Sequence, residues 1–218
     1  MFYLNNYIMI KKFTLLKKLR YYAHIKPLSI ILVVTLISTT AFSQSFTAKG
    51  DMDFFSIFHV ETYASPAFAD LDGDNDLDLY IGDGLGKIRF YTKNEAGYFA
   101  FNRYLQSDNI DIDLGNSTPI FEDLDGDNDL DLYVGESNGK IHAYLNDGIG
   151  NFSAGGYLKA NGNDIDAGLY SCPAFADLNG DNDLELYVGE KDGYIKVFIN
   201  DGTGNFSAEG NLQSSGID

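Results

Sequence analysis

The sequence predicts an all-β fold, made of about three copies of a four-stranded antiparallel sheet and preceded by a signal peptide. Three observations support this prediction: an internal repeat of 53 to 54 residues, apolar side chains at every second position within each copy, and a basic N-terminus that is followed by an apolar run. Alternation with a period of two is typical of half-buried strands, and short Gly-rich connections between such runs are typical of hairpins.

The first 43 residues are predicted to be a signal peptide. They carry six Lys and Arg side chains and no acidic residue, and the apolar run at 28–42 has about the length of a signal-peptide core. Ala41 and Ser43 are small residues at the positions that precede a cleavage site before Gln44. A membrane-spanning helix needs about 20 apolar residues, and this run is shorter and is interrupted by Ser and Thr. An uncleaved membrane anchor is therefore only the second interpretation. We therefore expect a secreted, periplasmic or cell-surface protein with no membrane insertion after cleavage.

The charge of the remaining chain, residues 44–218, is strongly acidic. It contains nine basic and 32 acidic residues. Such a surface repels phosphate backbones and anionic headgroups, so we expect no nucleic-acid partner and no peripheral membrane binding. The single cysteine, Cys172, cannot form an internal disulfide, and we expect it to be a small buried side chain.

The internal repeat defines the organisation of this acidic region. The segment PAFADLDGDNDLDLYIG at 66–82 recurs as PIFEDLDGDNDLDLYVG at 119–135 and as PAFADLNGDNDLELYVG at 173–189. The similarity continues through the residues that follow each copy. We therefore divide the region into repeats at about 57–109, 110–163 and 164–218.

Each copy is predicted to contain four strands. In the first copy these are 66–70, 77–82, 87–93 and 96–105, and Gly86 supplies the positive φ of a hairpin turn between the second and third. Four strands in about 50 residues match one blade of a β-propeller. Closed propellers have roughly four to eight blades, so about three blades form an incomplete array, which needs further repeats or oligomer partners to close.

A nine-residue acidic loop lies between the first two strands of each copy. Acidic side chains at loop positions 1, 3 and 5 converge when the chain curls, and a carboxylate at position 9 closes the ring. Crowded carboxylates repel one another, and a hard divalent cation removes this conflict. Ca²⁺ accepts six to eight oxygen ligands in flexible geometry, whereas Zn²⁺ prefers His or Cys.

The loops therefore predict about three Ca²⁺ ions per chain. By analogy with helical calcium loops, position 7 is expected to bind through its main-chain carbonyl rather than its side chain. The predicted ligands of the first loop are Asp70, Asp72, Asp74, Asp76 and Asp78; of the second, Asp123, Asp125, Asp127, Asp129 and Asp131; and of the third, Asp177, Asn179, Asp181, Asp183 and Glu185.

Two other interpretations of the loops are EF-hands and acidic turns without a metal. An EF-hand needs Glu at position 12 and a helix on each side, but position 12 here is Ile81, Val134 or Val188, and the flanking segments are predicted strands. The EF-hand is therefore excluded. Solvated acidic turns without a metal remain the alternative to calcium sites.

The repeats resemble the FG-GAP/VCBS repeat family, which is related to the calcium-binding propeller of integrin α subunits. The family pattern of Phe followed by an Asp-x-Asp-Gly-Asp-Gly-x-x-Asp loop is similar to the segments that begin at Phe68, Phe121 and Phe175. The second Gly of the pattern is Asn in all three copies, and Asn tolerates the left-handed conformation better than most residues. The resemblance implies a seven-bladed calcium-binding propeller, usually in exported proteins and often beside other domains.

The expected function is a calcium-binding module for adhesion or for binding an extracellular protein or glycan, without catalysis. No Ser/His/Asp arrangement and no phosphate-binding glycine loop recurs in the sequence. The alternative is an accessory propeller of a larger secreted enzyme, for instance one that acts on polysaccharide, with its catalytic domain outside this chain.

Overall fold

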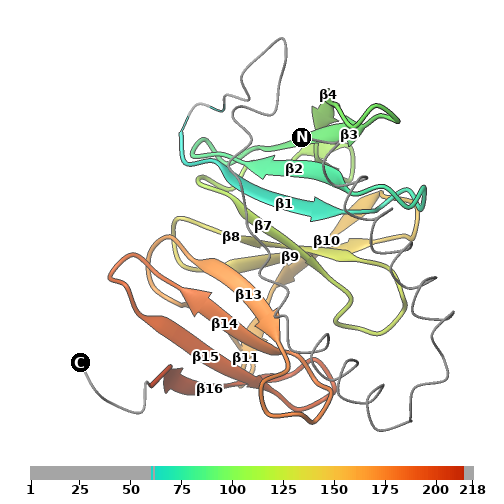
Figure 1. Cartoon of the computed structure of the whole chain (residues 1–218). Coiled ribbons are helices and arrows are strands. Elements are labelled where there is room, and N and C mark those ends of the chain that lie inside the picture. Colours follow the sequence, from blue (N-terminus) through green and yellow to red (C-terminus); the bar gives the residue numbers. More distant parts are fainter. Residues whose placement is uncertain (1–59, 61, 214–218) are drawn as a thin grey trace, which may run out of the picture. The chain divides into compact units, whose positions relative to one another are not determined.

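The computed structural model describes residue 60 and residues 62–213 (Figure 1). All regular secondary structure in this part is β-strand, which confirms the all-β prediction. No helix within it is long and apolar enough to cross a bilayer. The predicted signal peptide lies outside the described residues.

The first sheet has the four strands that the sequence predicts. They pair in the antiparallel order β1-β2-β3-β4, and Gly86 forms the β2–β3 turn at φ +94. A main-chain hydrogen bond from Gly86 N to Asp83 O closes that turn at 3.0 Å. The strands are β1 (Ser65–Ala69), β2 (Asp78–Gly82), β3 (Ile88–Lys93) and β4 (Phe99–Tyr104).

The second and third sheets repeat this arrangement in the same register. Phe68 pairs with Leu79 in the first sheet, and the equivalent Phe and Leu residues pair in the other two. The equivalent strands are β7 (Thr118–Glu122), β8 (Asp131–Gly135), β9 (Ile141–Asn146) and β10 (Phe152–Tyr157) in the second sheet, and β13 (Cys172–Ala176), β14 (Glu185–Gly189), β15 (Ile195–Asn200) and β16 (Phe206–Asn211) in the third.

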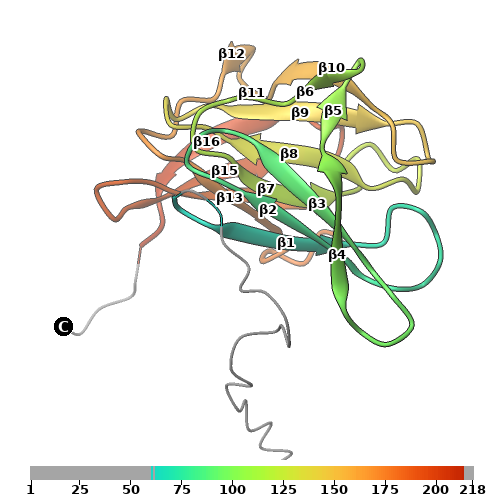
Figure 2. The same ribbon diagram turned by 90° about the horizontal axis from the view of Figure 1, so that it is seen from above.

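Two short hairpins extend the second and third sheets to six strands, where the sequence predicts four. β5 (Gln106–Ser107) and β6 (Ile110–Asp111) follow the first sheet in the chain but join the second, because β5 pairs in parallel with β10 (Figure 2). β11 (Lys159–Ala160) and β12 (Asn163–Asp164) join the third sheet in the same way. The repeat boundary expected at 109/110 falls within the turn between β5 and β6.

The apolar core lies between successive sheets. In the first and second sheets, we call the face that is turned to the next sheet in the chain the front face and the opposite one the back face. In the third sheet, the front face is the one formed by the equivalent residues. The front face of the first sheet packs Tyr80, Ile88 and Phe90 against Phe121 and Leu132 from the back face of the second sheet. The ring of Tyr80 lies 4.8 Å from that of Phe90 and 4.7 Å from that of Phe121. A second cluster joins the front face of the second sheet to the back face of the third.

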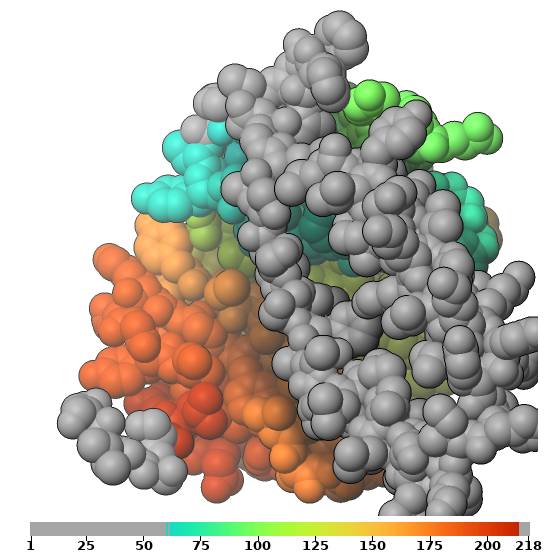
Figure 3. All heavy atoms as spheres, viewed as in Figure 1, coloured from blue at the N-terminus to red at the C-terminus, as the bar shows by residue number. Residues whose placement is uncertain are grey.

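The front face of the third sheet is more open than its two equivalents. Ile195 is 42% exposed, whereas the equivalent residues Ile88 and Ile141 are completely buried. In Figure 3 the third sheet, in orange and red, forms part of the visible surface. Cys172 is exposed, so the expectation of a buried cysteine is wrong. The equivalent residue Thr118 is covered by the next repeat, since its hydroxyl donates to Ser171 O at 2.7 Å, and the described residues include no repeat after the third.

Candidate metal centre

The three acidic loops connect the first two strands of each sheet and share one backbone conformation. In the first loop Gly73 and Asn75 have φ values of +74 and +67, and the second and third loops repeat this pair of left-handed residues. The left-handed conformation is thus adopted by Asn75, Asn128 and Asn182. These residues stand where the repeat pattern has its second Gly, and Asn tolerates this conformation better than most residues.

The first Asp of each loop is fixed by two main-chain N–H groups. Asp70 Oδ1 accepts a hydrogen bond from Gly73 N at 2.8 Å, and its Oδ2 accepts one from Asn75 N at 2.9 Å. Asp123 accepts the equivalent bonds from Gly126 N at 2.8 Å and Asn128 N at 3.0 Å. Asp177 accepts them from Gly180 N at 2.6 Å and Asn182 N at 3.1 Å. The left-handed turns thus orient the position-1 carboxylate in every copy.

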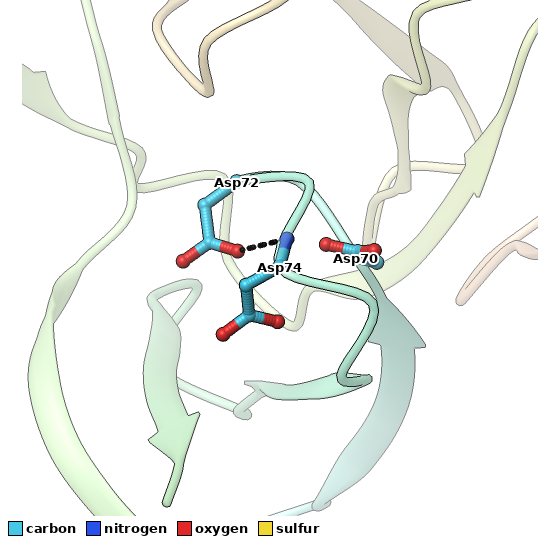
Figure 4. A group of neighbouring side chains, drawn as sticks. All are labelled: Asp70, Asp72 and Asp74. Atoms are coloured by element: carbon cyan, nitrogen blue, oxygen red, sulfur yellow. Dashed lines mark hydrogen bonds between the residues drawn. The ribbon is translucent and has the colours of Figure 1, made fainter.

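Positions 3 and 5 bring two more carboxylates to the first. Asp72 Oδ1 accepts Asp74 N at 3.2 Å, and Asp74 Oδ1 accepts Asp76 N at 2.7 Å. Figure 4 shows the first of these bonds and the side chains of Asp70, Asp72 and Asp74. One oxygen from each of the three carboxylates lies within 4.8 Å of the others, and the second loop brings Asp123, Asp125 and Asp127 together in the same way.

The third loop keeps this geometry with a neutral residue at position 3. Asn179 Oδ1 accepts Asp181 N at 2.9 Å, as the position-3 Asp does in the other loops. Its amide nitrogen donates to Asp181 Oδ2 at 2.8 Å and to Glu185 Oε1 at 3.3 Å. The third loop therefore offers one carboxylate fewer, and its side chains are partly tied to one another.

The position-9 acids are buried at the start of the second strand. Asp78 and Asp131 are 4% and 1% exposed, and their Oδ1 atoms accept Lys93 N and Asn146 N at 2.8 Å. Burial raises the pKa of the Asp78 carboxyl above its usual value, the N–H of Lys93 lowers it, and the loop carboxylates raise it further. The pKa of the Asp131 carboxyl is also raised, and burial is again the first cause.

The position-7 side chains are directed to neighbouring groups. The carboxylate of Asp76 forms an ion pair with Lys93 Nζ. The carboxylates of Asp129 and Asp183 lie beside Gly148 and Gly202 in the following hairpins. This placement is consistent with main-chain rather than side-chain coordination at position 7, although the carbonyl contact itself stays a prediction.

Asn residues at the end of the third strand of the second and third sheets support the loops, and the sequence did not predict this role. Asn146 Nδ2 donates to Leu130 O at 3.1 Å, and its Oδ1 accepts Gly150 N at 3.0 Å. Asn200 makes the equivalent bonds to Leu184 O and Gly204 N, and its Oδ1 also accepts Gly202 N at 3.2 Å. The sequence signal for them is the Asn-Asp-Gly that recurs at 146–148 and 200–202.

The donor set fits a hard cation. The side-chain donors that converge in the first two loops are all carboxylate oxygens, and no His or Cys belongs to either group. Oxygen ligands on a flexible loop suit Ca²⁺. Bringing three carboxylates within 4.8 Å of one another costs electrostatic repulsion, which a bound divalent cation would offset.

Comparison with known proteins places the loops in a family. The model of the FG-GAP-like repeat matches residues 70–134 and, in a second overlapping match, residues 123–188. Both matches begin at the first Asp of an acidic loop, and together they span more than half of the chain. No curated protein matches the chain. On the strength of these two matches, which extend across successive sheets, the chain belongs to the FG-GAP-like repeat family.

Proposed function

We propose that this β-propeller-type repeat module binds Ca²⁺ and serves as an exported, non-catalytic binding or adhesion module. The observation that carries the proposal is the pair of aspartate groups, each with three carboxylate oxygens within 4.8 Å of one another, at the same place in two successive sheets. Carboxylates this close repel one another, and a bound divalent cation would offset that repulsion.

Five positions of each nine-residue loop have a defined part in this proposal. Positions 1, 3, 5 and 9 supply side-chain oxygens, and position 7 supplies its carbonyl. The bound ion supplies positive charge that compensates the carboxylates and holds the connection between the first two strands in one conformation. Asp70 and Asp123 are already oriented by their hydrogen bonds, so binding there needs little rearrangement.

Calorimetric titration of the metal-free chain with Ca²⁺ tests the metal site. We expect uptake with dissociation constants of roughly 10⁻⁴ to 10⁻³ M, as in extracellular calcium modules. Replacing Asp72 and Asp125 together by Asn provides a nearly isosteric control that lowers the charge of both aspartate groups. Absence of heat and of bound calcium at millimolar concentrations would show that the loops are ordinary turns.

Export and the type of partner are supported by less direct features. The N-terminal 43 residues have the composition of a signal peptide, and the region that follows is strongly acidic. Family membership agrees with an extracellular or cell-surface location. Separating membrane, periplasmic and medium fractions of expressing cells, with N-terminal sequencing of the product, tests cleavage before Gln44.

The open face of the third sheet supports a partner that continues the array. Ile195, Leu212 and Leu178 are 42%, 51% and 69% exposed, whereas their equivalents in the first sheet are buried or half-buried. We propose that a further repeat or a second protein molecule covers this face, because each of the first two sheets is covered by a sheet of the same kind.

A further inference from the structure

A polar cavity of about 450 Å³ lies at the first junction, which we define as the contact between the first and second sheets. Residues from β4 and the β5–β6 hairpin form one wall, and the β9–β10 hairpin forms the other. This volume falls within the range of about 300 to 1,000 Å³ that small-molecule sites occupy. The cavity is separate from the acidic loops, since none of the predicted calcium ligands lines it.

Hydrogen bonds hold the two walls in place. Asp108 N donates to Phe152 O at 3.0 Å, and Asp108 Oδ2 accepts Ala154 N at 3.5 Å, so the hairpin is tied to β10 of the second sheet. On the other wall, Asp147 Oδ1 accepts Ile149 N and Asn151 N, each at 3.1 Å. A ligand would therefore meet a surface that is already ordered, which lowers the entropic cost of binding.

Several polar groups on these walls are free to bind a ligand. The guanidinium of Arg103 has no carboxylate partner within 62–213, and the ring of Phe90 lies 5.8 Å from it. The side chains of Asn109 and Ser153 make no hydrogen bond to the described residues. These groups offer both donors and acceptors, and the guanidinium of Arg103 can form charge-assisted hydrogen bonds.

The cavity is lined by charged groups of both signs, which suits a ligand without a net charge that can both donate and accept hydrogen bonds. Arg103 opposes a cation, and the carboxylates of Asp108 and Asp147 oppose an anion. Hydroxyl groups both donate and accept, so they can pair with guanidinium, amide and carboxylate groups together. Leu145 lines the cavity and is 41% exposed. A single exposed leucine can contact the C–H groups of a small ligand, but it offers too little apolar surface for a peptide that binds through large apolar side chains.

We propose that this cavity binds a neutral saccharide, with Arg103 and Asn109 donating to its hydroxyl groups and Asp108 accepting from them. The inference rests on the proposed binding role of the module, and it names the class of ligand and the place where it binds. It does not depend on calcium, because the cavity walls are ordered by hydrogen bonds of their own.

The second junction, between the second and third sheets, lacks the groups that the proposal needs. The repeat places Gly156 where the first junction has Arg103, and Gly162 where it has Asn109. We therefore expect one saccharide site in the described part of the chain, at the first junction. The second junction also supplies a control for the substitution of Asn109, since Asn161 is a left-handed Asn in its hairpin.

Saturation-transfer NMR on the full chain tests this inference. The probes are the methyl glycosides of glucose, galactose, mannose, N-acetylglucosamine, fucose and xylose, each with and without Ca²⁺. Asn109→Gly keeps the backbone relaxed, because Asn109 has φ +64 and Gly already occupies the equivalent position. Asn161→Gly, at φ +52 in the second junction, is the matched control.

We expect at least one glycoside to bind the wild-type chain. Arg103→Ala and Asn109→Gly should each weaken that binding about 10-fold or more, the size expected for the loss of a hydrogen bond to a ligand. Asn161→Gly should leave it unchanged. No signal from any glycoside, equal binding by Arg103→Ala, or a signal from triglycine in place of the glycosides would overturn the inference.

The calcium response of the same samples separates this inference from the proposed function. Calcium uptake without glycoside binding would remove the saccharide site and leave the metal sites in place. Glycoside binding that depends on Arg103, in a chain that takes up no calcium, would support the saccharide site and contradict the metal proposal.

Discussion

The front faces of the second and third sheets are made of almost the same residues but differ in what covers them. Ile141 in the second sheet is completely buried, and Ile195, its equivalent in the third, is 42% exposed. Tyr133 is 3% exposed and packs its ring 5.2 Å from that of Phe175, whereas the equivalent Tyr187 is only half-buried. The sequence of a repeat therefore specifies a face that suits burial, and the neighbouring sheet decides whether burial takes place.

From this difference we expect each sheet of the array to depend on its neighbour for part of its stability. Its core positions gain their full stabilisation, about 1.5 to 3 kcal/mol for a large aliphatic side chain, only against the next sheet. Equivalent substitutions in the two sheets should consequently have unequal effects, and the following experiments measure that inequality from the largest expected effect to the smallest.

Self-association should be the largest consequence of the open face. We expect the purified chain to be oligomeric in light scattering, even with calcium, because exposed apolar side chains and a free sheet edge favour association. Ile195→Lys should shift the population towards monomer by placing a charge on that face. A wild-type chain that is a stable monomer would show that three sheets suffice.

Alanine substitutions at the paired isoleucines should differ in their effect on stability. Ile141→Ala should reduce the free energy of unfolding by about 2 to 5 kcal/mol, since it leaves a cavity between two sheets. Ile195→Ala should cost on the order of 1 kcal/mol, because part of that side chain already contacts solvent. Urea denaturation measures both, and equal losses would mean that the face of the third sheet is covered in solution.

Calcium should stabilise the chain through each loop separately. A ligand in about 100-fold excess over its dissociation constant adds about 2.7 kcal/mol per site if it binds only the folded state. A chelator should therefore lower the melting temperature, and Asp72→Ala, Asp125→Ala and Asn179→Ala should each reduce that response. If the melting curves in chelator and in calcium coincide, the proposed metal sites are wrong.

Two glycines in the same hairpin position provide a matched pair of backbone tests. Gly139 and Gly193 have φ values of +91 and +87, so alanine at either costs about 1 to 2 kcal/mol of left-handed strain. A Cβ at Gly139 would also overlap the main-chain oxygen of Gly168, whereas one at Gly193 would meet nothing within 4 Å. Gly139→Ala should therefore be the more destabilising by roughly 1 to 3 kcal/mol, as calorimetry can establish.

The smallest expected effect is a pH dependence confined to the second sheet. His142 occupies the position of Arg89 and Lys196 in the other sheets. Burial lowers the pKa of His142 below its ordinary value of 6.5, and Glu136 opposes the shift. Because the folded chain then binds fewer protons, stability should fall as the pH decreases below about 6.5 towards the folded-state pKa. His142→Gln should remove that part of the pH profile, and an unchanged profile would contradict the assignment.

The sequence predicted the strands of each sheet and the three acidic loops well, because repetition makes the alternation and the loop spacing visible three times. It did not predict the β5–β6 and β11–β12 hairpins, since strands of two residues carry no periodicity. The hydrogen bonds of Asn179 also depend on which atoms face one another, and residue type alone does not determine this.

Burial was the property that local sequence predicted least well. Phe68 and Phe121 are equivalent residues, but the first is 50% exposed and the second 9%, because the second lies between two sheets. Cys172 follows the same pattern at the other end of the described array. In both cases the position in the repeat is the same, and the surroundings of the side chain come from a different part of the chain.

The hairpin that each repeat contributes to its successor has a consequence for how such chains lengthen. Leu105 and Ile112 flank the β5–β6 hairpin and are buried between the first two sheets. One period of about 53 residues therefore encodes both a sheet and the hairpin that pairs with the next sheet. Tandem duplication of any such period, wherever its ends fall, would insert a sheet together with a complete interface. Growth or shrinkage by whole periods therefore preserves every type of contact in the array, whereas an insertion of any other length would have to be accommodated in a loop.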